Sequence, residues 1–277
     1  MLRYFCFLLS FVLFTSCYKN KVIDVKRNPF EVMPVSFRQN VLLETFAQES
    51  LNETVSTTAF ISDLEKLYPD GLYPVSLHRN DFLATAYSDY LGTKLGGLVD
   101  ILHGSVSRSM VENTLGNEDH LLLLSQQNWA YAIGKFSKQQ APLSIALETS
   151  ADTNGKGNLQ VYIAHKEAIP GDTRIMVYML ENEVQPVFQE GAPAGFKHRH
   201  VLKNLLTAFD GDPIDLSRAH PEGEIIKKSY NGFDLSQYNT AQLQIVVFIC
   251  TQSNDLRQLK VLNVQGVNFY GVHYWDI

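Results

Sequence analysis

The sequence predicts an α+β protein in which an α/β unit precedes an antiparallel β-sandwich, and two observations support this fold class. Between Asn40 and Asn80, an apolar run, an amphipathic helix and a second strand-like run follow one another, which is the order of a β-α-β opening. After Pro142, six or more short strand-like runs are separated by turns, with no helical spacing between them. Such a succession is typical of a sandwich, so we predict a boundary near Gln140.

The opening unit is predicted from its apolar runs and its helix signals. Its strands are expected at Val41–Phe46 and Leu72–His78. The helix between them is expected to begin at Ser50, because Ser50-Leu51-Asn52-Glu53 fits a capping box. The turn Pro69-Asp70-Gly71 ends it. The buried face of this helix consists of apolar residues at helical spacing, namely Phe60, Ile61, Leu64, Leu67 and Tyr68.

Helices and strands continue to alternate up to the predicted boundary. A second helix is expected at Asp81–Leu91, followed by a short strand at Leu98–Leu102. Asn117 is expected to cap a longer helix, because Glu118 and Asp119 in its first turn suit the helix dipole. The apolar stripe of this third helix consists of Leu122, Trp129, Ala132, Ile133 and Phe136.

The strands of the predicted sandwich show apolar alternation, most clearly in Leu159–Ile163 and Ile175–Leu180. Turns such as Thr153–Gly157 and Pro170–Asp172 separate them. The strands are predicted at Ser144–Ser150, Leu159–His165, Arg174–Asn182, Glu224–Tyr230, Gln242–Thr251 and Gln258–Phe269.

The first residues are typical of a secretory signal. Arg3 supplies a positive charge, Phe5–Phe14 are almost uniformly apolar, and small residues lead to Cys17. The apolar run is too short to span a bilayer. It resembles the bacterial lipoprotein box, in which a cysteine sulfur receives a lipid carrying acyl chains such as palmitate. We predict a lipoprotein signal peptide over residues 1–17, ending at lipidated Cys17, and a tether over residues 18–37. The alternatives are an ordinary cleaved signal and a short uncleaved anchor.

The cysteine count and the net charge indicate which disulfides and which classes of partner to expect. Of three cysteines, Cys6 lies in the signal and Cys17 is the predicted lipid site, so Cys250 alone remains and no intrachain disulfide is expected. Cys250 ends an apolar run and is interpreted as a buried strand residue. A net charge of −6 and a pI near 5.7 provide no basic surface for nucleic acid. We therefore expect no nucleic-acid partner.

Several stretches together resemble a known family. A signal and lipid cysteine, Asn40–Phe46, Val75–His78, a helix bearing Trp129, and Phe196–Lys203 resemble the Omp28-related outer-membrane lipoproteins of Bacteroidetes. The resemblance covers nearly the whole mature chain. It implies a thioredoxin-like domain over residues 38–140 and an immunoglobulin-like β-sandwich over residues 141–277. It also implies a lipid anchor in the outer membrane, on the periplasmic face or at the cell surface.

The resemblance identifies a degenerate redox site. Many members carry Cys-x-x-Cys after the first strand, and the matching positions here are approximately Leu51 and Thr54, give or take one residue. Thiol–disulfide exchange requires a thiolate at a helix N-terminus and a resolving thiol, which neither residue supplies. The loop that holds a cis-proline in such folds corresponds to Gly92–Gly97, which has no proline. We therefore expect no catalytic residue and no cofactor.

Two constellations invite a metal interpretation. His198 and His200 on a strand would direct both imidazoles to one face, and Asp210–Asp215 is rich in carboxylates. However, the neighbouring Lys197 and Arg199 oppose a divalent ion, and the acidic stretch lacks the glycine and glutamate of a calcium loop. We expect no metal site, with the histidines in the sandwich scaffold and the carboxylates in a solvated loop.

Two classes of function remain. The sequence favours a non-catalytic binding or structural and adhesion module, partnered by the membrane through its lipid and by a protein or surface ligand. The alternative is an envelope thioredoxin-like oxidoreductase or redox-linked chaperone, which the resemblance implies and the missing Cys-x-x-Cys opposes.

Overall fold

A computed structural model describes residues 28–95, 102–112, 120–169, 173–214, 220–251, 253 and 260–275. Cys17 and most of the predicted tether lie outside these residues. The helices are η1 (Pro29–Glu31), α1 (Glu53–Leu67), α2 (Ala86–Lys94) and α3 (Gln126–Phe136). The strands are β1 (Val41–Ala47), β2 (Leu72–His78), β3 (His103–Val106), β4 (Val111–Glu112), β5 (His120–Leu121), β6 (Leu143–Ala151), β7 (Gly157–His165), β8 (Arg174–Glu181), β9 (Val201–Leu205), β10 (Asp212–Pro213), β11 (Ile225–Phe233), β12 (Leu243–Cys250), β13 (Val261–Asn268) and β14 (Val272–His273).

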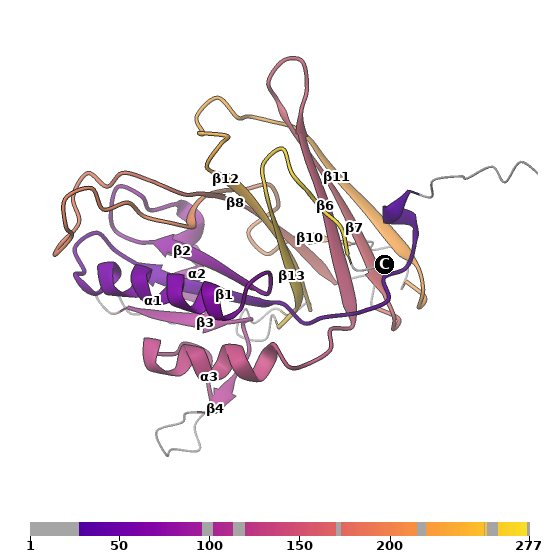
Figure 1. Ribbon diagram of the computed structural model, residues 1–277, viewed down its shortest axis with the longest axis horizontal. Helices are drawn as coiled ribbons and strands as arrows, with labels where there is room; N and C mark the ends of the chain where they lie inside the picture. The colour runs from indigo at the N-terminus through magenta and orange to yellow at the C-terminus, as the bar shows by residue number, and fades with distance from the viewer. Residues whose placement is uncertain are drawn as a thin grey trace, which may run out of the picture.

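The predicted α+β class is confirmed, and a single mixed sheet crosses both sequence halves (Figure 1). This sheet has the strand order β13-β12-β8-β9-β2-β1-β3, with β10 paired to β8. β1 and β2 are parallel, and β9 joins the halves by pairing parallel to β2 and antiparallel to β8. The second sheet is antiparallel, with the order β11-β7-β6-β14, and faces one end of the mixed sheet. The boundary predicted near Gln140 falls in the connection between α3 and β6.

The halves share apolar cores because β8 is covered on both faces. Met176, Tyr178 and Leu180 pack in the same core as Leu91 of α2. The intervening residues of β8, such as Val177, pack against the second sheet. The expected alternation of apolar and polar residues in Ile175–Leu180 is therefore wrong, because a strand buried on both faces is apolar throughout.

Helix starts differ from the sequence predictions. α1 begins at Glu53 after Asn52, so the predicted capping box at Ser50 is wrong. The Ser50 hydroxyl instead accepts a hydrogen bond of 2.6 Å from the side-chain amide of Gln48. α2 begins after Thr85, whose hydroxyl accepts from the backbone N–H of Ser88, and not at Asp81.

The third helix and the predicted loop at Gly92 also need correction. α3 begins at Gln126, so Leu122 precedes it, while Asn117 lies outside the described residues. α2 continues through Lys94, so the first residues of the stretch Gly92–Gly97 are helical and not a loop. In the described ranges, no peptide bond is cis.

A buried ion pair between Glu44 and Arg108 is connected to the second half of the chain through Tyr178. We call Glu44, Tyr87, Arg108 and Tyr178 the Glu44 network. Arg108 donates two hydrogen bonds of 2.8 Å to the Glu44 carboxylate and one each to the hydroxyls of Tyr87 and Tyr178. Tyr178 also lies 2.9 Å from a Glu44 oxygen. Although burial opposes it, the Glu44 carboxylate raises the pKa of the Arg108 guanidinium well above its usual value. The network thus links β1, α2, the turn after β3, and β8.

Candidate functional site

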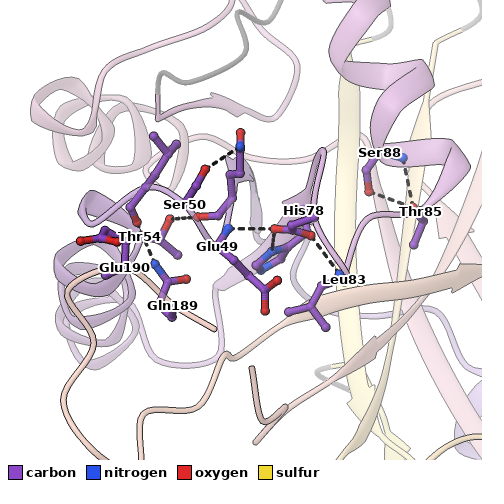
Figure 2. A network of polar contacts seen from close by, with 12 residues as sticks. Glu49, Ser50, Thr54, His78, Leu83, Thr85, Ser88, Gln189 and Glu190 are labelled. Atoms are coloured by element: carbon purple, nitrogen blue, oxygen red, sulfur yellow. Dashed lines mark hydrogen bonds and ion pairs between the residues drawn. The ribbon is translucent and has the colours of Figure 1, made fainter. Parts of the chain in front are cut away.

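The candidate site lies at the carboxyl ends of β1 and β2, where the chain turns from each strand towards the following helix (Figure 2). In open α/β sheets, ligands bind outside the carboxyl ends of the parallel strands. Leu51 and Thr54, which the family resemblance places approximately at its two cysteines, lie here. We call Glu49, His78, Asp81, Gln189 and His198 the Asp81 cluster.

Asp81 organises the two turns. One carboxylate oxygen lies 2.7 Å from Nδ1 of His78 and accepts a hydrogen bond of 2.9 Å from the backbone N–H of Glu49. The other oxygen accepts from the backbone N–H of Leu83 at 2.9 Å. The Asp81 side chain is 5% exposed, so these contacts are protected from water. They explain why Asp81 lies in a turn and does not begin a helix.

His198 packs on His78 from the connection between β8 and β9. The two imidazole rings meet edge to face with centroids 4.6 Å apart, and Phe196 contacts His198 from another side. Burial and the neighbouring His78 lower the pKa of His198 to about 4, although Asp81 opposes this shift. His198 is therefore neutral at physiological pH.

Residues 183–200, which we call the covering segment, lie over the β1–α1 turn. The backbone N–H of Glu190 donates to the carbonyl of Glu49 at 2.8 Å, and the Gln189 side chain donates to the carbonyl of Leu51 at 2.8 Å. Further along, Arg199 contacts α1 through the carboxylate of Glu65 at 3.0 Å. The segment is thus fastened to the β1–α1 turn near its middle and to α1 near its C-terminal end.

Leu51 and Thr54 form hydrogen bonds that hold the β1–α1 turn in place. Thr54 is 3% exposed, and its hydroxyl donates to the carbonyl of Gln48 at 3.0 Å. The Leu51 carbonyl accepts from the N–H of Thr54 as well as from Gln189. A cavity of about 20 Å³ beside Thr54 has room for about one water molecule. Neither side chain carries a group that ionises near neutral pH.

The remaining cysteine of the predicted mature chain is remote from this chemistry. Cys250 on β12 is fully buried in the core shared by the two halves. Burial raises the pKa of its thiol to about 11, so the thiolate is scarce at neutral pH.

Several polar atoms of the Asp81 cluster are buried without a hydrogen-bond partner among the described residues. They are Oε1 of Glu49, Nε2 of His78, Oε1 of Gln189 and Nε2 of His198. Sequence reasoning missed this cluster, because Asp81 matched a helix start and Gln189 matched no motif. The only available signal was His78 at the end of a predicted strand, a position that parallel sheets use for function.

The two histidines considered for metal binding lie in different surroundings. Both precede β9, so the expectation that they share one face of a strand is wrong. His200 has a φ of +54° and its Nε2 lies 3.0 Å from Glu65, whereas His198 packs on His78. Over the part of the chain that the structure describes, no three His, Cys, Asp or Glu side chains gather as a metal site. None of the described helices is long and apolar enough to cross a membrane.

Comparison with known proteins identifies a family and two similar folds. Residues 114–270, more than half of the chain, match the family model described as outer membrane protein Omp28. HBP35 of Porphyromonas gingivalis has a TM-score of 0.66 at 19% identity, covering 84% of this chain and 76% of that one. Protein AGR_C_4864 from Agrobacterium tumefaciens has a TM-score of 0.53 at 9% identity, covering 84% and 96%. At these identities the two structures show a shared fold alone. No curated protein sequence matches significantly.

Proposed function

The chain belongs to the Omp28 outer membrane protein family, and from this premise we propose that it is a lipid-anchored, non-catalytic binding module of the outer membrane. The observation that carries this proposal is the state of the β1–α1 turn. Leu51 and Thr54 stand where thiol chemistry needs cysteines, and the covering segment is hydrogen-bonded to this turn.

The chemistry of the surrounding groups supports a non-catalytic role. Thiol–disulfide exchange requires two thiols within reach of each other, and Cys250 lies on a buried strand of the shared core. The hydrogen bonds that the described structure gives the Asp81 cluster include no serine or threonine hydroxyl and no cysteine thiol, so its imidazoles stand beside no such group to activate. The turn is therefore suited to holding a shape and not to turning over a substrate.

The surface around this turn supports recognition of a protein. Phe82 follows Asp81 and is 79% exposed, while Val187 and Phe188 precede Gln189 and are 75% and 58% exposed. Asp81, next to Phe82, bonds to Glu49, and Gln189, next to Phe188, bonds to Leu51. The exposed apolar residues therefore belong to two separate chain segments that both contact the β1–α1 turn. Exposed aromatic residues held on a fastened backbone are typical of protein-binding surfaces.

The anchor is assigned to Cys17. Small residues precede it after a short apolar run, and Tyr18 and Lys19 supply no acidic signal of the kind that retains some lipoproteins at the inner membrane. One acyl chain binds a membrane only marginally, so the several chains of a bacterial lipoprotein would hold the domain firmly. Labelled palmitate should enter the wild-type protein and not Cys17→Ser, which should leave the membrane fraction. Equal labelling of both proteins would contradict the assignment.

An insulin-reduction assay with dithiothreitol tests the non-catalytic role. We expect the mature protein and Cys250→Ser to give the same turbidity time course as buffer. Thiol-dependent reduction that disappears in Cys250→Ser would instead favour the oxidoreductase or redox-linked chaperone. The double variant Leu51→Cys/Thr54→Cys is the matched dithiol control. We expect it to reduce insulin slowly, because the covering segment is hydrogen-bonded to Leu51 and to the neighbouring Glu49.

Site-specific photo-crosslinking in intact cells tests recognition at the turn. A photoreactive residue placed at Phe82 or Phe188 should yield the same discrete adduct, whereas one at Tyr131 of α3, which is 44% exposed, should not. The adduct is identified by mass spectrometry. Adducts that are equally abundant from all three positions, or absent from both phenylalanine positions, would refute the proposed surface.

A further inference from the structure

A polar cavity of about 260 Å³ lies at the opposite end of β1 from the Asp81 cluster. Residues from the N-terminal approach to β1, from β6, from β13 and from the C-terminal stretch line it. β1 spans seven residues, or about 20 Å, between the two locations. The cavity lies between the two halves of the chain, and binding pockets occur frequently at such interfaces.

The floor of the cavity is fixed by carboxamides. Asn263 accepts hydrogen bonds from the N–H groups of Asn40 and Val264. Its side-chain amide donates to the carbonyls of Arg38 and Leu143 at 3.1 and 2.8 Å. All the donors and acceptors of Asn263 are thus used to join three segments, and the floor is built before any ligand arrives.

Asn40 presents an acceptor on this rigid floor. Its side-chain amide donates both protons, to the carbonyl of Val264 at 2.9 Å and to Oε1 of Gln265 at 2.8 Å, which fixes the orientation of the carboxamide. Asn40 is only 8% exposed, and its buried Oδ1 has no hydrogen-bond partner among the described residues. A ligand atom that donates a hydrogen bond would satisfy this oxygen.

The rim carries opposite charges and an aromatic ring. Arg38 and Asp70 both line the cavity, so neither sign of charge dominates its mouth. Tyr274 is 49% exposed, and one face of its ring stacks on Phe30 at a centroid distance of 4.8 Å. A supported ring of this kind offers an apolar face beside hydrogen-bonding groups.

We propose that this cavity binds a neutral saccharide unit. A sugar hydroxyl donates to Oδ1 of Asn40, others exchange hydrogen bonds with Asp70 and Arg38, and the apolar face of the ring packs on Tyr274. An ammonium ligand would meet Arg38, and an anion would meet Asp70 and the acceptor of Asn40. An uncharged molecule with several hydroxyl groups can bond to Arg38, Asp70 and Oδ1 of Asn40 at the same time without burying an unpaired charge.

Isothermal titration of the full-length mature protein, in a detergent without a sugar headgroup, tests this proposal. The probes are the methyl glycosides of glucose, galactose and N-acetylglucosamine, with cadaverine and acetate as charged controls. We expect saturable binding of at least one glycoside, weakened about fivefold by Tyr274→Ala and by Asp70→Asn. Both variants change exposed residues, and Tyr131→Ala, an exposed tyrosine that does not line the cavity, should bind as the wild type does.

Three outcomes would overturn the saccharide assignment. They are no saturation by any glycoside up to about 10 mM, equal affinities in Tyr274→Ala, Asp70→Asn and Tyr131→Ala, and tighter binding of cadaverine or acetate than of every glycoside. Because the cavity and the β1–α1 turn lie at opposite ends of β1, each of these results leaves the crosslinking and insulin tests of the proposed function unaffected.

Discussion

The Glu44 network and the Asp81 cluster both attach to β1 and its end, yet they differ in how completely their polar atoms are paired. In the Glu44 network, the carboxylate, the guanidinium and both tyrosine hydroxyls contact one another within 2.6–2.9 Å. In the Asp81 cluster, Asp81 is fully engaged, whereas His78, His198 and Gln189 each keep a buried atom without a partner.

This difference indicates which buried polar groups already have all their hydrogen-bond partners and which can still form new hydrogen bonds. A buried network in which every group is satisfied gains strength from low dielectric and is costly to disturb. A cluster with free buried donors and acceptors loses less when one member changes, and it can bind a group that supplies the missing contacts. We therefore expect the Glu44 network to contribute more to stability than the Asp81 cluster, which holds the turn beside the surface proposed for recognition.

The largest effect is expected from breaking the Glu44 network. Arg108→Met leaves the Glu44 carboxylate buried and unpaired, so the free energy of unfolding in urea should fall by about 3–5 kcal/mol. Adding Glu44→Met should recover part of this loss, because two apolar side chains then replace two charges. If the double variant is no more stable than Arg108→Met alone, the cost does not come from an unpaired charge.

A smaller loss is expected at the Asp81 cluster. Asp81→Ala removes the acceptors for the N–H groups of Glu49 and Leu83 and the contact with His78, which should cost about 2–3 kcal/mol. Hydrogen exchange of the Glu49 and Leu83 amides should accelerate. The matched control is Asp63→Ala, since the Asp63 side chain is 72% exposed and its ion pair with Lys66 contributes little. Equal losses of stability in the two variants would contradict the conclusion that the hydrogen bonds of Asp81 stabilise the two turns.

The pKa of His198 predicts a pH dependence of stability for the Asp81 cluster. Because burial and His78 lower this pKa to about 4, the folded state favours the neutral imidazole, whereas the unfolded chain titrates near 6.5. The contribution of His198 to stability is present above pH 6.5 and is lost as the pH falls from 6.5 towards 4. Urea midpoints measured across this window should decline less steeply in His198→Phe than in the wild type. Parallel curves would exclude His198 as the source.

The smallest effect is expected at Ser50. Its hydroxyl accepts from the exposed side chain of Gln48 and caps no helix, so Ser50→Ala should change the unfolding free energy by less than about 0.5 kcal/mol. A true N-cap would cost about 1 kcal/mol on the same substitution. Thr85→Ala is the matched variant, since the Thr85 hydroxyl accepts the Ser88 N–H at 3.1 Å. A larger loss at Ser50 than at Thr85 would restore the capping box.

Local patterns in the sequence determined the elements and the order of the fold. The predicted strand Leu72–His78 coincides with β2, and the strand predicted at Val41–Phe46 differs from β1 by one residue. These runs are recognisable because apolar burial imposes its period on neighbouring residues. The same local signals misplaced the start of α1, because Ser50-Leu51-Asn52-Glu53 matches the sequence pattern of a capping box. In the structure, Glu190 and Gln189 are hydrogen-bonded to the carbonyls of this turn, and the helix begins at Glu53.

Only the tertiary structure decided how distant segments meet. β9 fuses two sheets that the sequence predicts separately, and Glu44 pairs with Arg108 and Tyr178, 64 and 134 residues further along. The cavity likewise combines Arg38 and Asn40 with Asn263 and Tyr274. No local period encodes such contacts, because they depend on the register of strands that are far apart in the chain. The sequence therefore located strands such as β1 and β2, while packing between distant segments created both the covered turn and the polar cavity.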